Sequence, residues 1–115
     1  MAFDNLLLER DGPVALLTIN RPKVLNALNS QTLDELRHAV LELKADEQVR
    51  VVILTGAGEK AFCAGMDLAE MSEAKRGVPP PDLMPDLGRN ITINKPTIAA
   101  VRGVAYAGGW RLAQM

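Results

Sequence analysis

Short apolar runs in the first half of the chain predict strands. The runs at 6–10 and 14–19 are separated by Asp11-Gly12, a pair typical of a hairpin turn because glycine tolerates the positive φ that such turns need. The run at 49–55 is almost continuously apolar and β-branched, which predicts a strand covered on both faces. The first half is therefore expected to contain three strands.

Helical spacing of apolar residues predicts a helix over 31–45, with Asn29 or Ser30 as its N-cap. Further helices are predicted over 67–74 and between 82 and 94, and a strand over 97–101. A last helix is expected to begin after the glycine pair at 108–109. The predicted buried stripe of the first helix consists of Leu33, Leu36, Val40 and Leu43.

Composition narrows the possible functions. The chain has 115 residues, 48% hydrophobic and 23% charged, which is typical of one globular domain. Its formal charge of −1 argues against a nucleic-acid surface, although residues 87–115 hold four basic residues and no acid. One cysteine allows no internal disulfide and leaves too few ligands for a cysteine-rich zinc site, and a histidine-based metal cluster or a Ser-His-Asp triad could use only His38. With no long apolar run and no basic segment at the start, we expect a cytoplasmic location and neither a membrane span nor a secretory signal.

Two familiar kinds of site are weakly indicated. Gly56-x-Gly58-x-x-Ala61 formally matches the dinucleotide fingerprint, but Gly65 interrupts the helix that should follow. Cys63 lacks an evident activating base, so a small, half-buried side chain is the better interpretation than a nucleophile. His38 lies away from the apolar stripe of its helix and is interpreted as solvated.

A repeated local pattern is more informative. A buried strand, a glycine-rich turn and a helix start occur at 49–68 and again at 97–113. The first N–H groups of a helix have no partner within it, so two such turns facing each other would hold one oxygen between two N–H donors. Spacing alone leaves open whether the turns face each other or are merely tight connections in an α/β core.

Three segments resemble the enoyl-CoA hydratase/isomerase (crotonase) family, in that family's order and spacing. Residues 20–28, NRPKVLNAL, are similar to its N-R-P-x-x-x-N-A-L segment. Residues 60–68, KAFCAGMDL, are similar to K-A-F-[SCA]-A-G-x-D-L, and residues 95–109 to K-P-x-I-A-A-V-x-G-x-A-x-G-G-G. The resemblance covers the chain from about Leu6 to its end.

This resemblance implies an α/β fold, a crotonase-like spiral of ββα turns. Residues 1–115 are expected to form the N-terminal part of one such domain, without the later turns and the C-terminal helical region. The implied substrate is an acyl thioester of coenzyme A, with coenzyme A belonging to the substrate and no separate cofactor or metal. The backbone N–H groups of Cys63 and Gly108 would form the oxyanion hole. Coenzyme A would contact Lys23, Val24, Leu25, Met66, Asp67 and Leu68.

The chain departs from the family pattern at two positions. Arg111 stands where family hydratases place a glutamate, and an arginine stays protonated and accepts no proton. Ala107 stands where the first of three glycines is usual. The family function is hydration or isomerisation of an enoyl-CoA, and the alternatives are a non-catalytic acyl-CoA-binding or scaffold remnant and, more distantly, a nucleotide-binding half-domain. A trimer or hexamer is implied for full-length relatives.

Overall fold

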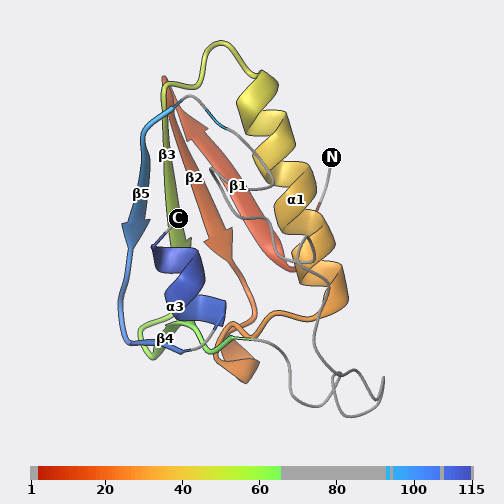
Figure 1. Ribbon diagram of the computed structural model, residues 1–115, viewed down its shortest axis with the longest axis vertical. Helices are drawn as coiled ribbons and strands as arrows, with labels where there is room; N and C mark the ends of the chain where they lie inside the picture. The colour runs from red at the N-terminus through yellow and green to blue at the C-terminus, as the bar shows by residue number, and fades with distance from the viewer. Residues whose placement is uncertain (1–2, 66–92, 94, 107, 115) are drawn as a thin grey trace.

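A four-stranded mixed sheet forms the centre of the computed structural model, which describes residues 3–65, 93, 95–106 and 108–114 (Figure 1). Its strand order is β1-β2-β3-β5. β1 (Leu6–Asp11) is antiparallel to β2 (Val14–Ile19), and β3 (Val51–Gly56) and β5 (Thr97–Ala100) continue the sheet in parallel. The arrows of β2, β3 and β5 therefore point to one end of the molecule.

The first two strands confirm the predicted hairpin. Leu6 pairs with Ile19 at its open end and Asp11 with Val14 at the turn. Gly12 has a φ of 59°, the left-handed conformation that the turn requires. The two strands are covered on one face by the core, to which Leu6 and Ile19 both belong.

α1 (Ser30–Ala45) confirms the predicted helix and its cap. The Asn29 side chain accepts a hydrogen bond from the Thr32 N–H at 2.8 Å, which satisfies one of the unpaired donors of the first turn. All four residues of the predicted stripe are buried. Three of them pack against the sheet in a core that also includes Leu17, Leu28, Phe62 and Leu112. The fourth, Leu43, packs in a second cluster with Ala15, Val49 and Val52.

Two short strands lie where the sequence predicts only glycine-rich turns. β4 (Ala61–Cys63) and β6 (Val104–Ala105) pair in parallel as a second sheet, and α3 (Gly108–Ala113) follows β6. Strands of two or three residues carry too little periodicity to be read from sequence, so this part of the prediction is wrong. A short 3-10 helix, η1 (Pro22–Val24), follows β2.

The predicted full coverage of β3 is also wrong. Val52 is buried, but its neighbours Val51 and Ile53 are only half-buried. On the adjoining strand, Ile98 is 53% exposed. The core gathers on the α1 side of the sheet, and the apolar sequence of β3 does not by itself distinguish one covered face from two. The predicted helices at 67–74 and 82–94 lie outside the described residues, except for Ile93 alone.

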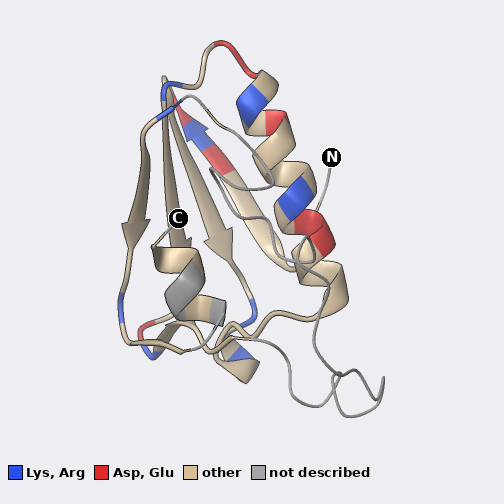
Figure 2. Ribbon diagram, viewed as in Figure 1, with Lys and Arg blue, Asp and Glu red and all other residues tan. Residues whose placement is uncertain are grey.

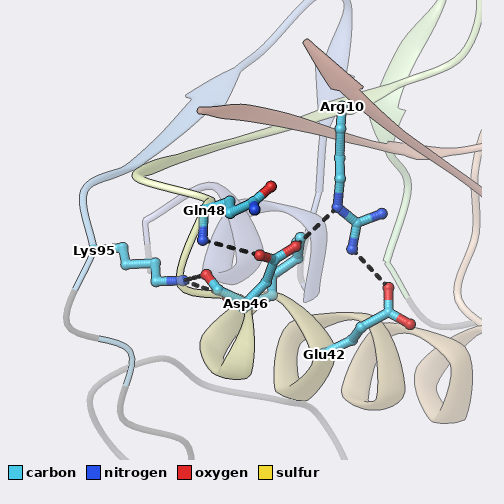
Figure 3. Close-up of polar contacts among 6 residues, drawn as sticks. Arg10, Glu42, Asp46, Gln48 and Lys95 are labelled. Carbon is cyan, nitrogen blue, oxygen red and sulfur yellow. Dashed lines mark hydrogen bonds and ion pairs between the residues drawn. The ribbon is translucent and has the colours of Figure 1, made fainter. Parts of the chain in front are cut away.

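Charged side chains connect the elements at the amino ends of the parallel strands (Figure 3). Arg10 of β1 donates to Glu42 at 3.0 Å and to Asp46 at 3.1 Å, at the end of α1. Lys95 donates to the Leu43 carbonyl at 2.6 Å and also to the Asp46 carbonyl. Lys95 thereby caps the C-terminus of α1, where unpaired carbonyls favour a cation. Within the described part of the chain, no helix has the length and hydropathy needed to cross a membrane.

Candidate functional site

The segments that carry the sequence motifs meet at the carboxyl ends of the parallel strands. β2 leads into the loop at 20–28, β3 leads into β4, and β5 leads through β6 into α3. Figure 1 shows η1, β4 and α3 together at this end of the sheet. In open α/β sheets, ligands bind outside the carboxyl ends of the strands. This end is therefore the candidate site.

The structure brings the two glycine-rich turns into direct contact. The Tyr106 N–H donates to the Cys63 carbonyl at 3.1 Å, and Cys63 pairs with Ala105 in the β4–β6 ladder. A Cβ on Gly109 would lie 2.0 Å from the Cys63 carbonyl oxygen, closer than atoms approach. Only glycine therefore allows the start of α3 to pack on Cys63. The first two residues of α3 are Gly108 and Gly109.

The β4–β6 pair is irregular at the point where it meets α3. Ala61 pairs with Val104 and Cys63 with Ala105, so β4 advances two residues while β6 advances one. This is the geometry of a β-bulge, which re-aims the chain and is common beside active sites. Because an extended residue directs its N–H and C=O to the same side, the Cys63 N–H also faces β6.

The Cys63 side chain is a fully buried thiol, and not the half-buried one expected from the sequence. Burial raises its pKa, which outweighs the opposing effect of the Gly65 N–H, 3.5 Å from Sγ. A thiol held neutral in this way is a poor nucleophile, in agreement with the interpretation from sequence. His38 lies on the exposed surface of α1, with Nε2 3.6 Å from an Asp34 oxygen, which agrees with a solvated residue.

The loop at 20–28 is joined to the strand exit after Cys63 by main-chain hydrogen bonds. The Ala64 N–H donates to the Leu25 carbonyl at 3.0 Å, and the Leu28 N–H donates to the Gly65 carbonyl at 2.7 Å. Leu25 has a φ of 55°, and its apolar side chain is 41% exposed. Lys23 and Val24 are also exposed. The three predicted coenzyme A contacts in this loop thus lie on the surface, and one of them, Leu25, is bonded to the residue directly after Cys63.

Basic residues predominate in the loops that follow β2, β3 and β5. Residues 20–28, 57–60 and 101–103 contain four basic residues and one acid, whereas acidic residues are frequent on α1 (Figure 2). The acid, Glu59, lies 3.9 Å from Arg102, and both side chains are well exposed. An excess of positive charge at this end favours an anionic ligand. The basic residues are Arg21, Lys23, Lys60 and Arg102.

Several predicted site residues are not brought together by the described structure. Met66, Asp67 and Leu68 lie outside the described residues, so their predicted contact with coenzyme A stays a prediction. Arg111 lies in α3, three residues after Gly108. Among the described residues, no group of three or more His, Cys, Asp or Glu is placed to hold a metal ion.

The dinucleotide interpretation is wrong because β4, not a helix, follows Gly58. A Cβ on Gly56 would lie 2.2 Å from the Phe62 carbonyl oxygen, so this glycine permits close packing of β3 on β4. Sequence reasoning also missed Asn26, which is fully buried at the centre of these contacts. The signal available for it was a polar residue between two apolar ones in the first motif.

Comparisons with known proteins agree with this geometry. The profile of the enoyl-CoA hydratase/isomerase family matches residues 9–115. The chain is 45% identical to a short-chain-enoyl-CoA hydratase of Clostridium acetobutylicum, over 98% of this chain and 44% of that protein. It is 41% identical to a probable enoyl-CoA hydratase of Mycobacterium tuberculosis, over 100% of this chain and 45% of that protein. The chain thus spans less than half the length of these curated relatives.

Solved structures show the same fold. An enoyl-CoA hydratase from Mycobacterium tuberculosis superposes with a TM-score of 0.78 at 38% identity, over 95% of this chain and 44% of that one. A carnitinyl-CoA dehydratase from Mycobacterium avium superposes with a TM-score of 0.76 at 42% identity, over 94% of this chain and 43% of the other. The predicted crotonase-like α/β fold is confirmed. The chain belongs to the enoyl-CoA hydratase/isomerase family.

Proposed function

We propose that this chain binds an acyl thioester of coenzyme A and holds the thioester carbonyl oxygen between two main-chain N–H groups, those of Cys63 and Gly108. The observation that carries the proposal is the packing of α3 on Cys63, where a Cβ at Gly109 would meet the Cys63 carbonyl at 2.0 Å. This packing supports the proposal because it brings the exit of β4 against the second residue of α3, directly after Gly108. The N–H groups of a first helical turn lack partners within the helix and are suited to an oxygen ligand.

Enoyl-CoA hydration and isomerisation both require this kind of donor pair. Removing an α-proton, or adding water across the α,β double bond, places negative charge on the thioester oxygen. Fixed N–H donors stabilise that charge without reorganising, and removing one such donor typically costs about 3–4 kcal/mol of transition-state stabilisation. The acyl group would therefore lie at the β4–α3 junction.

The coenzyme portion would extend from this junction over the loop at 22–25. Its phosphates would meet the basic loops, and the exposed side chains of Val24 and Leu25 offer apolar surface. Lys23 would contribute positive charge, and Met66, Asp67 and Leu68 would complete the contact. The main-chain bond between Ala64 and Leu25 supports this continuity, because it joins the loop to the strand exit.

Arg111 favours a second candidate function, a non-catalytic acyl-CoA-binding protein. An arginine accepts no proton from an attacking water, so it cannot replace the glutamate of family hydratases. Hydration of crotonoyl-CoA, measured on this chain and on Arg111→Glu, separates the two functions. Turnover by the parent chain supports a hydratase, whereas turnover by Arg111→Glu alone shows that the parent lacks only the catalytic acid. Binding of crotonoyl-CoA by both without turnover assigns the chain to the non-catalytic function.

The donor pair itself is tested by the amide NMR signals of Cys63 and Gly108. We expect crotonoyl-CoA to move both signals downfield and coenzyme A alone to leave them nearly unchanged, because only the thioester brings the carbonyl oxygen. The Cys63 N–H faces β6, so main-chain carbonyls of β6 compete with the thioester oxygen for this donor. A response at Gly108 without one at Cys63 would overturn the assignment of the first donor, and no response at either would overturn the oxyanion hole.

Three expectations beyond the site stay predictions. They are the cytoplasmic location, the trimeric or hexameric assembly of a full-length relative, and the need for no cofactor besides the coenzyme A of the substrate. Size-exclusion chromatography with light scattering tests the second of them directly.

A further inference from the structure

Asn26 occupies an unusual position for a polar residue. Its side chain is fully buried, and its φ of 57° follows a φ of 55° at Leu25. Two successive non-glycine residues in the left-handed region are sterically unfavourable, and asparagine tolerates this conformation better than most residues. Such strain persists only where surrounding contacts impose it, and it is frequent at ligand-binding segments.

The Asn26 side chain connects two separate parts of the site. Its Oδ1 accepts from the Arg21 N–H at 2.9 Å, while the Asn26 N–H donates to the Arg21 carbonyl at 2.8 Å, which closes the loop at 21–26 on itself. Its Nδ2 donates to the Ala57 carbonyl at 3.0 Å and to the Ala61 carbonyl at 2.8 Å. Both amide hydrogens are used on the β3–β4 segment, so one end of the side chain holds the loop and the other holds β4.

Other side chains cannot make this connection. Aspartate has the same shape but would place an oxygen against two carbonyl oxygens, which repels instead of bonding. Glycine would accept the left-handed backbone but would leave the Ala57 and Ala61 carbonyls without these donors. Asparagine meets both requirements, the backbone conformation and the hydrogen bonds.

We propose that Asn26 is a positioning residue that couples the loop at 22–25 to the exit of β4. This inference rests on the proposed function, in which the loop contacts coenzyme A and Cys63 contributes a donor. Ala61, which accepts a hydrogen bond from Asn26, lies two residues before Cys63. Ala64, which donates to the Leu25 carbonyl, directly follows Cys63. A ligand that orders the loop therefore also orders the Cys63–Gly65 segment, and the hydrogen bonds of Asn26 carry the effect.

The test compares Asn26→Asp and Asn26→Gly with a matched control, Asn29→Ala. Asn29 also uses its side chain to accept a backbone N–H, but in the cap of α1. Hydrogen exchange of the Ala64 and Leu28 amides reports the two bonds that join the loop to the strand exit. We expect both Asn26 variants to accelerate exchange at these amides by about ten-fold or more, and Asn29→Ala to change it by less than about three-fold.

Titration with coenzyme A gives the second measurement. In the parent chain, saturating coenzyme A should slow exchange at Ala64, and both Asn26 variants should lose this response and bind about ten-fold more weakly. Variants that bind weakly yet keep the response at Ala64, or that leave exchange at Ala64 and Leu28 unchanged, would overturn the coupling. If the parent chain itself does not bind coenzyme A, the proposed function fails, and the exchange of the unliganded variants still decides whether Asn26 joins the two segments. If Asn26→Asp does not fold, the exchange and binding measurements are made on Asn26→Gly alone.

Discussion

At the amino ends of β2, β3 and β5, charged side chains add to the main-chain hydrogen bonds and connect α1 to the sheet, whereas at the carboxyl ends close main-chain packing and one buried amide connect the elements (Figures 1 and 3). Arg10 reaches Glu42 and Asp46 through a side chain that is 39% exposed. At the other end, the Ala64 N–H bonds to the Leu25 carbonyl and Gly109 packs on Cys63 without room for a methyl group. The two ends of the sheet thus differ in the kind of contact that connects their elements.

The difference agrees with the function proposed for the carboxyl end. In an exposed ion pair, water competes with each charged group for its partner, and both side chains are long and mobile. Such a pair connects two elements without fixing the distance between them closely. Close main-chain packing leaves little freedom, because any added atom meets backbone. A site that holds one oxygen between two N–H groups needs positions accurate to a fraction of an ångström. The close main-chain packing at the carboxyl end therefore supports the proposed site, and no such site is proposed at the amino end.

The largest expected effect is at Gly109. Gly109→Ala would place a Cβ 2.0 Å from the Cys63 carbonyl oxygen and should lower the free energy of unfolding by about 3 kcal/mol, since neither backbone can move freely. Urea unfolding measures it. Gly12→Ala is the control, because nothing lies within 4 Å of the added Cβ and only the positive φ opposes it. Its expected cost is about 1 kcal/mol, and equal losses for the two variants would contradict close packing at α3.

The second effect concerns Lys95 at the opposite end. Lys95→Met keeps much of the apolar stem but removes the ammonium group from the Leu43 and Asp46 carbonyls. Loss of these charge-assisted bonds to a helix C-terminus should cost about 1.5 kcal/mol. The same urea experiment measures it, and coenzyme A affinity should stay at the parent value. A variant that loses affinity as well would show that the two ends are not independent.

The third effect is a pH dependence at Cys63. Burial raises the pKa of this thiol above its ordinary value of 9.0, so the unfolded chain loses the proton first as the pH rises. Folding stability should therefore fall from about pH 9 until the pH reaches the pKa of the folded thiol, by at most about 1.4 kcal/mol per pH unit. Unfolding curves of the parent and of Cys63→Ala, measured between pH 7 and 10.5, test this. The parent should show the steeper decline, and parallel curves would contradict a buried neutral thiol.

The smallest effect is at Arg10. The pKa of Arg10 is raised, mainly by its hydrogen bond to Glu42. The pKa of Asp46 is lowered, mainly by the hydrogen bond from the Gln48 N–H and to a smaller extent by Arg10. A double-mutant cycle with Arg10→Met and Glu42→Gln should give a coupling of about 0.5 kcal/mol that decreases with added salt. The contribution of Asp46 to folding stability is fully present above the ordinary carboxyl pKa. It is lost as the pH falls through the lowered pKa of Asp46 in the folded chain. A salt-independent coupling well above 1 kcal/mol would contradict an exposed pair.

Sequence reasoning predicted the elements with long, regular patterns. The hairpin, the capped helix α1 and the strands β3 and β5 are all present, each within about two residues of the prediction. β4 and β6 were missed because they contain three and two residues, and their pairing joins segments about 40 residues apart, which no local pattern records. Tertiary packing also explains the glycines at 56 and 109, whose neighbours are carbonyls of β4.

The site was predicted in part, and chiefly from the family resemblance. Local sequence suggested two glycine-rich turns, but only the fold shows that they touch. Asn26 was not singled out, because its role depends on carbonyls at 57 and 61 that lie more than 30 residues away. The oxyanion assignment to Cys63 and Gly108, and the coenzyme contacts at 66–68, stay predictions.

The most direct test of the account is the infrared carbonyl stretch of bound crotonoyl-CoA, labelled with ¹³C at the thioester carbon. Gly108→Pro removes one N–H at the first helical position, where proline is well tolerated, and Gly108→Ala keeps that N–H. We expect the stretch to move to lower frequency on binding to the parent and to Gly108→Ala, and to return toward the free value in Gly108→Pro. A bound thioester whose stretch stays at the free value in the parent chain, or is shifted equally in Gly108→Pro, would contradict the claim that main-chain donors at this junction hold the oxygen.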